Sequence, residues 1–179
     1  MYLLCDAFPE AQVGDPLNPR LKVIGVGNEW RGDDAAGLLV ARRLRADPLP
    51  QVEIAECRGT VTAVREAWNA AAGVIVVDAV VSGGRPGTIY RFNAHSAGAP
   101  VQLSRSPSSH GWGVAEALAL GQVFQDLPPC LIIYGIEGHN FGPGQEVSEA
   151  VEAAIPEAVR RIRREIQTWL GRDSPGSIT

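Results

Sequence analysis

Short apolar runs alternate along the chain with longer segments in which apolar residues recur every three or four positions. The apolar runs predict strands at Lys22–Val26, Val52–Ala55, Val74–Val77, Thr88–Phe92 and Leu131–Tyr134. The periodic segments predict helices over Asp34–Arg45, after Thr60, over Gly113–Gln122 and along the C-terminal part of the chain. This alternation predicts a single α/β domain of three layers, with helices on both faces of a twisted five-stranded sheet.

The predicted sheet is mostly parallel, with one antiparallel strand. The run Val74–Val77 is almost wholly apolar, which is typical of a central strand covered on both faces. The turn from Ser82 to Gly87 is too short to hold a crossover helix, so the strand Thr88–Phe92 is expected to run antiparallel beside Val74–Val77. In the C-terminal helical segment, Pro156 either opens a second helix or kinks one.

The domain boundaries are expected near residues 21 and 170. Residues 1–20 are interrupted by three prolines and a glycine, which prevent a long helix and predict a loosely held N-terminal arm. Residues 171–179 are polar and turn-rich, which predicts a flexible C-terminal tail. A chain of 179 residues is long enough for residues 21–170 to bury a core of their own.

Charge and composition exclude several classes of protein. The net charge is −4, and the one dense basic run, between Arg160 and Arg164, falls on a predicted helix, which argues against general nucleic-acid binding. No apolar stretch approaches the ~20 residues that cross a bilayer, and the N-terminus lacks a signal-peptide pattern. We therefore expect a cytoplasmic protein without a membrane partner. Cys5, Cys57 and Cys130 form no Cys-x-x-Cys pair and are expected to be reduced, structural thiols.

The first predicted strand leads into a glycine loop that ends in two adjacent carboxylates, Asp33 and Asp34. A dinucleotide-binding loop would carry a third glycine where Trp30 stands, and its following helix would be free to receive a pyrophosphate. Two carboxylates at that end would repel the pyrophosphate, so a nucleotide-binding module is the weaker alternative. The acids either cap the helix or hold a cation at the edge of the sheet.

Three residues are predicted to meet beyond the carboxyl ends of the strands, where open α/β sheets place their sites. Asp34 follows the first strand, Asp78 ends the central apolar strand, and His110 stands ahead of the helix over Gly113–Gln122. Two carboxylates and an imidazole suit a borderline divalent metal such as nickel, zinc or iron. The sequence therefore predicts an acid, acid and histidine cluster at this edge of the sheet.

Structural alternatives exist for these residues. Asp34 could cap its helix, and His110 could serve only the entry of its helix. Asp78 follows four apolar residues, so its charge needs solvent, a partner or a metal to offset desolvation. His95, expected to be solvated, and His139, expected on the rim of the site, could each replace His110.

Other catalytic constellations have little support. The chain contains no Gly-x-Ser-x-Gly elbow and no His-Glu-x-x-His helix, which argues against common serine hydrolases and zincins. A triad of Ser108, His110 and Asp78 is conceivable, but serines around a histidine in a loop are commonplace. A thiol pair of Cys57 and His110 is also conceivable, although nothing in the sequence lowers the pKa of that thiol.

Several short motifs occur together in a fixed order. They are Gly25-Val26-Gly27-Asn28, Asp33-Asp34 with Gly37, Gly59-Thr60, Val77-Asp78-Ala79-Val80, Pro86-Gly87-Thr88, Ser109-His110 and Gly135-Ile136-Glu137. In this order and spacing, over roughly residues 21–170, the chain resembles the nickel-iron hydrogenase maturation endopeptidases. Agreement of several motifs is far more specific than any one of them.

The resemblance implies an α/β peptidase, aspartic-type or dependent on the nickel of its substrate. Such an enzyme removes a C-terminal extension from the precursor of a hydrogenase large subunit after nickel insertion. The resemblance further implies that Asp34, Asp78 and His110 contact this nickel, and that the enzyme, expected to be a monomer, has no metal cofactor of its own. Either the nickel polarises the scissile carbonyl, or Asp34 or Asp78 acts as general base. A non-catalytic chaperone of the precursor is a further alternative.

The chain departs from the family pattern at two places. The position of Asp34 is often glutamate in the family, so its reach is shorter by one methylene. The segment from Glu56 to Thr60 differs from the usual Asp-Gly-Gly-Thr, and the sequence assigns no role to Glu56, Arg58, Glu137 or His139. Asp33 is expected to cap its helix, while Gly25 to Asn28 shape the turn that presents Asp34.

Overall fold

The fold is a five-stranded mixed sheet between two pairs of helices, seen in a computed structural model that describes residues 21–69, 71–96 and 113–172. The elements in chain order are β1 (Leu21–Val26), the 3₁₀ helix η1 (Gly32–Ala35), α1 (Ala36–Ala46), β2 (Val52–Cys57), α2 (Val61–Trp68), β3 (Gly73–Val80), β4 (Ile89–Asn93), α4 (Val114–Phe124), β5 (Cys130–Glu137) and α5 (Glu149–Arg172). The strand order is β2-β1-β3-β5-β4, with β4 antiparallel to β5 and the other pairs parallel. The mostly parallel α/β sheet predicted from the sequence is confirmed.

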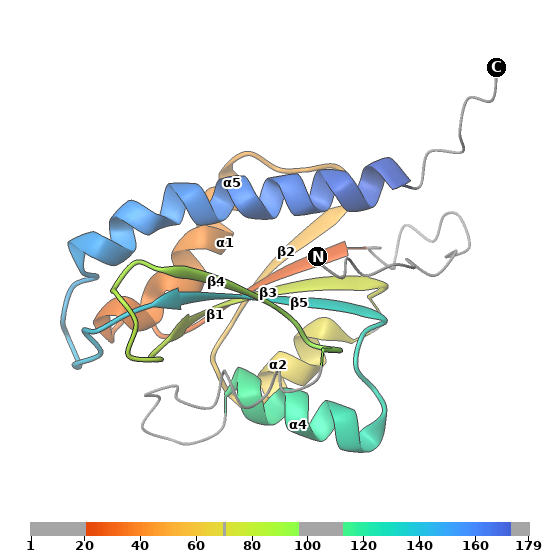
Figure 1. The fold of residues 1–179 in the computed structure, drawn as a ribbon, viewed down its shortest axis with the longest axis horizontal. Coiled ribbons are helices and arrows are strands. Elements are labelled where there is room, and N and C mark those ends of the chain that lie inside the picture. Colours follow the sequence, from red (N-terminus) through yellow and green to blue (C-terminus); the bar gives the residue numbers. More distant parts are fainter. Residues whose placement is uncertain (1–20, 70, 97–112, 173–179) are drawn as a thin grey trace.

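Helices cover both faces of the sheet, as predicted. In Figure 1, α1 and α5 lie on one face and α2 and α4 on the other. Successive side chains of a strand point to opposite faces, so each central strand contributes to two cores. Val77 of β3 packs in the core under α1 and α5, while Val76 packs in the core under α2 and α4. Burial on both faces explains the unbroken apolar run of β3.

The position of β4 corrects one expectation. The strand is antiparallel, but it pairs with β5, with Ile89 opposite Ile136, and not with β3. The prediction of β3 as its neighbour was wrong because β3 already has two parallel partners, β1 and β5. β4 therefore adds to the free edge of β5.

The structure describes the C-terminal boundary of the α/β domain but not the segment before residue 21. The C-terminal segment is one helix, α5, with Pro156 inside it, so Pro156 does not open a second helix. This helix continues to Arg172, two residues into the segment 171–179 that was expected to be a tail. The expected arm at 1–20 lies outside the described residues. Within the described part of the chain, no helix is long and apolar enough to cross a membrane.

Candidate active site

A tight turn at the end of β1 positions Asp34. Gly27 has a φ of 150°, and a Cβ at this residue would lie 1.9 Å from the backbone oxygen of Asp34. The N–H of Asn28 donates to that same oxygen over 3.2 Å. Only glycine allows the chain to pass so close in this backbone conformation. The turn after β1 therefore presents Asp34, as the sequence predicted.

Two further glycines bring this turn close to the end of β3. A Cβ at Gly37 would lie 2.2 Å from the backbone oxygen of Val77 and 2.3 Å from that of Val26. A Cβ at Gly25 would lie 2.3 Å from the backbone oxygen of Gly37. The first turn of α1 thus rests directly on β1 and β3. Because Asp78 follows Val77, this packing brings η1 and Asp34 toward Asp78.

Asp78 and Asp34 form an electrostatically coupled acid pair. Burial, and after it the negative charge of Asp34, raise the pKa of Asp78 to about 8, against a hydrogen bond from the N–H of Ala79 that lowers it. Burial also raises the pKa of Asp34, although the charge of Arg31 and the N–H of Asn28 oppose this. The pair therefore holds a proton near neutral pH, as two close carboxyl groups in a poorly solvated site do.

Cys57 ends β2 beside the acid pair. It lies opposite Val26 in the parallel ladder, at the same end of the sheet as Asp78. Burial raises the pKa of its thiol to about 11, and the charge of Asp78 contributes. The expectation that this thiol is not activated is confirmed, and a neutral thiol is a poor nucleophile.

The third predicted member of the cluster, His110, lies outside the described residues, together with Ser108. The helix that follows it, α4, packs on the same face of the sheet as Val76 and Val80, the neighbours of Asp78 on that face. Within the described ranges, no group of three His, Cys, Asp or Glu side chains is arranged to hold a metal ion. The described part of the site therefore consists of the acid pair.

His95 is placed away from the acid pair. It follows β4, and its Nε2 lies 2.9 Å from the backbone oxygen of Pro128, just before β5 begins. β5 is parallel to β3, so the beginning of β5 and the end of β3 lie at opposite ends of the strands. The exposed ring of His95 was expected from the sequence, but this position removes it as a substitute for His110.

The role expected for Asp33 was wrong. Its side chain is fully buried and accepts the backbone N–H groups of His139 and Asn140 at 2.9 Å and of Ser148 at 2.7 Å. It does not cap η1, because carbonyls of the segment after β5 already bind the N–H groups of Gly32 and Asp33. Asp33 therefore links η1, through hydrogen bonds, to the segment between β5 and α5.

Electrostatics agree with a structural role for Asp33. Burial alone would raise its pKa, but the three N–H donors outweigh burial and lower the pKa below its ordinary value. Asp33 thus stays ionised, in contrast to the neighbouring acid pair. His139, with a side chain 57% exposed, places Nδ1 3.5 Å from the Asp33 carboxylate, at the rim of this contact.

Glu137 also serves the framework. It is buried at the end of β5, and its carboxylate accepts the N–H groups of Ser82, Gly83 and Gly84 over 2.8 to 3.0 Å. The hydroxyl of Ser82 donates a fourth hydrogen bond over 2.6 Å. Glu137 therefore holds the turn between β3 and β4, and these bonds occupy its carboxylate.

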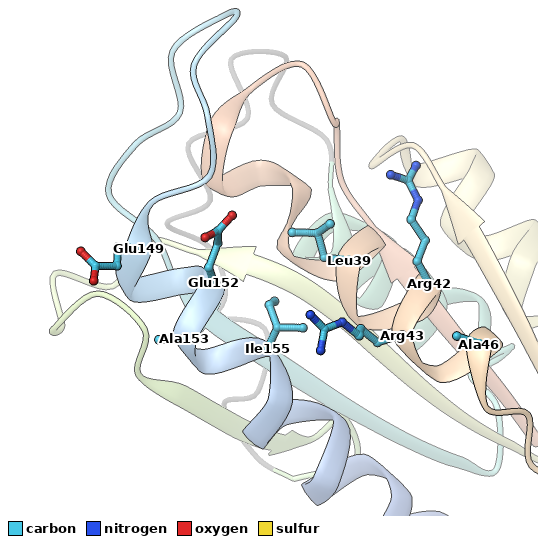
Figure 2. Close-up of a pocket in the computed structure, with 8 residues that line it drawn as sticks. All are labelled: Leu39, Arg42, Arg43, Ala46, Glu149, Glu152, Ala153 and Ile155. Atoms are coloured by element: carbon cyan, nitrogen blue, oxygen red, sulfur yellow. The ribbon is translucent and has the colours of Figure 1, made fainter.

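Two cavities differ in their relation to the acid pair. A cavity of about 170 Å³ adjoins the turn that holds Asp34 and is lined by Gly27, Asn28, Glu29, Trp30, Leu38, Arg42, Glu56, Cys57 and Arg58. A larger one, of about 710 Å³, lies between α1 and α5 (Figure 2). In Figure 2, Arg43 extends toward α5 while Arg42 points away from it. The larger cavity lies on the opposite face of the sheet from Asp78, so we assign the site to the smaller one.

Comparisons with known proteins identify a family and similar folds. The sequence profile of the HycI hydrogenase maturation protease family matches residues 55–165, more than half of the chain. The hydrogenase maturating endopeptidase HybD of E. coli has a similar structure, with 24% identity, a TM-score of 0.71, and coverage of 83% of this chain and 93% of HybD. An endopeptidase from Escherichia coli, seen in solution, is 25% identical, with a TM-score of 0.74 and the same coverage. The HycI maturation protease of Thermococcus kodakarensis KOD1 is 24% identical, with a TM-score of 0.62 and again this coverage. No curated protein sequence matches the chain.

Proposed function

The chain belongs to the hydrogenase maturation protease family, and we propose that it removes the C-terminal extension from a nickel-loaded precursor of a hydrogenase large subunit. The observation that carries this proposal is the coupled acid pair of Asp34 and Asp78 at the carboxyl ends of β1 and β3. This is where an open α/β sheet places its site. Two adjacent carboxyl groups offer oxygen ligands and a group that exchanges a proton near neutral pH.

The nickel belongs to the substrate in this proposal, and the enzyme has no metal of its own. Asp34 and Asp78 contact the nickel, and His110 contributes the imidazole that this metal favours. A divalent cation stabilises the ionised form of a carboxyl group, so nickel binding releases the proton that burial holds on Asp78. A precursor without nickel brings no cation that offsets the free-energy cost of ionising Asp34 and Asp78 together. The site thereby distinguishes a loaded precursor from an empty one.

Cleavage follows from the position of the bound precursor. With the nickel at the acid pair, the nearby peptide bond is fixed relative to Asp34 and Asp78, and orientation of this kind supplies part of the rate. A carboxylate at this place can take a proton from the attacking water and return it to the leaving amine. The cut bond is the amide, and water supplies the hydroxyl and the proton of the products.

The competing functions predict different results in one assay. The purified protein is incubated with the nickel-loaded large-subunit precursor encoded in the same genome, and the mass of the precursor is then measured by mass spectrometry. We expect the loss of a short C-terminal peptide. A stable complex with a precursor of unchanged mass would contradict the proposal and identify a chaperone.

Calorimetry with NAD and ATP tests the nucleotide-binding alternative. We expect no binding, because Trp30 occupies the place of the third glycine of a nucleotide loop and the carboxylates of Asp33 and Asp34 would repel a pyrophosphate.

A further inference from the structure

The 170 Å³ cavity can receive one side chain of a bound polypeptide. It has room for about five or six water molecules of ~30 Å³ each, which is close to the bulk of a single side chain. Two of its lining residues, Gly27 and Asn28, touch the backbone of Asp34. A third, Cys57, is close enough to Asp78 for the charge of Asp78 to affect it. A polypeptide bound at the acid pair therefore has its neighbouring residues at this cavity.

Most of the charges around the cavity are already compensated. Arg42 donates to Glu29 over 3.1 Å and to Glu56 over 3.0 Å, and Arg45 donates to Glu56 as well. These contacts use the carboxylates of both lining glutamates. They also answer the open question about Glu56, which joins β2 to α1 through two arginines.

Arg58 differs from the other charged lining residues. It is exposed directly after β2, and the described part of the chain places no carboxylate within ion-pair distance of its guanidinium. A guanidinium binds a carboxylate through two parallel hydrogen bonds, and an accessible one at a substrate cavity is suited to an anionic group. The lining therefore favours a negatively charged occupant.

Trp30 gives the cavity an apolar wall. Trp30 is 72% exposed, although a tryptophan in a folded protein normally buries most of its surface. Its backbone is held on both sides, because its N–H donates to Oδ1 of Asn28 over 3.0 Å and its carbonyl accepts from Gly144 over 2.7 Å. An indole and a guanidinium that line the same cavity suit a side chain with a short aliphatic part and a carboxylate end.

Building on the proposed function, we propose that Arg58 is a specificity-determining residue that binds an acidic side chain in the C-terminal segment of the precursor. The carboxylate pairs with the guanidinium of Arg58, and the methylene groups of the same side chain pack against Trp30. Arg58 stands in a segment that departs from the usual Asp-Gly-Gly-Thr of the family, so this selectivity belongs to this chain.

The test measures KM and kcat for cleavage of the nickel-loaded precursor encoded in the same genome. We expect Arg58→Gln to raise KM about tenfold and to change kcat less than about twofold. Arg58→Lys keeps the positive charge but lacks the planar guanidinium that binds a carboxylate through two hydrogen bonds, so it should give an intermediate KM. Arg164→Gln is the matched control, because Arg164 is exposed on α5 away from the cavity.

A charge exchange identifies the partner residue. Each acidic residue in the C-terminal segment of the precursor is changed to lysine and assayed with Arg58→Glu, and one such pair should restore a KM near that of the native pair. An unchanged KM for Arg58→Gln, an equal effect of Arg164→Gln, or no restoring pair would overturn the role of Arg58. These results require a wild-type enzyme that cleaves. A wild-type enzyme that does not cleave contradicts the proposed function itself.

Discussion

Asp78→Asn is expected to lower the rate of precursor cleavage about a thousandfold or more while the domain stays folded. The amide is almost isosteric with the carboxyl group, but it carries no negative charge for the nickel and cannot exchange a proton with the reacting atoms. Single-turnover cleavage of the nickel-loaded precursor, followed by mass spectrometry, measures the loss. Asp126→Asn is the matched control, because Asp126 is an exposed acid paired with Arg65 beyond the end of α4. Full activity of Asp78→Asn would remove Asp78 from the mechanism.

The same variant has a predictable effect on stability. Asp78 has a pKa of about 8 in the folded protein and about 4 in an unfolded chain. Between these values the folded state keeps a proton that the unfolded state has lost, so this group lowers the free energy of unfolding as the pH rises. Asp78→Asn lacks this titration. Denaturation of the metal-free proteins should therefore show the variant gaining stability over wild type between about pH 4 and pH 8, and parallel curves would contradict the raised pKa.

Gly27→Ala is expected to reduce both stability and activity. Its Cβ would lie 1.9 Å from the backbone oxygen of Asp34, in a backbone conformation that side chains rarely adopt. Relief of this contact requires the turn or η1 to move, at a cost of about 2 to 4 kcal/mol in the free energy of unfolding. Because Asp34 moves with η1, the folded variant should also lose about a hundredfold in cleavage rate.

Gly83→Ala provides the comparison that separates contact from backbone strain. Gly83 also has a positive φ, of 84°, but no atom lies within 4 Å of the position that its Cβ would take. This variant should lose only about 1 kcal/mol and should cleave the precursor normally. Urea denaturation and the cleavage assay measure both variants. Similar losses for Gly27→Ala and Gly83→Ala would show that contact with Asp34 is not what requires glycine at residue 27.

The sequence predicted the layers of the fold because the spacing of apolar residues along each segment shows which of its faces are buried. The apolar run of β3 indicated a central strand, and Thr60 indicated the start of α2, where its side chain accepts the N–H of Ala63. The partner of β4 was not predictable in the same way. A short turn determines that two strands run in opposite directions, but the pairing of β3 with both β1 and β5 determines which edge remains open.

The candidate site was predictable to a similar extent. Asp34 follows β1 and Asp78 lies near the end of β3, and the carboxyl ends of neighbouring parallel strands lie close together. The glycines that allow their approach were visible as motifs, while the distances that require them depend on tertiary packing. The roles of Asp33 and Glu137 were not predictable from the sequence, because most of their donors are backbone N–H groups from distant segments, which any residue type can supply. His110 remains a prediction, since it lies outside the described residues.

The central claim is that the acid pair recognises the nickel of the precursor. Its most direct test compares cleavage of the same large-subunit precursor prepared with and without nickel, at equal concentrations and without other added metal. We predict that the nickel-loaded precursor loses its C-terminal extension and that the nickel-free precursor keeps its full mass. Equal cleavage of both precursors, or cleavage of neither, would contradict the claim.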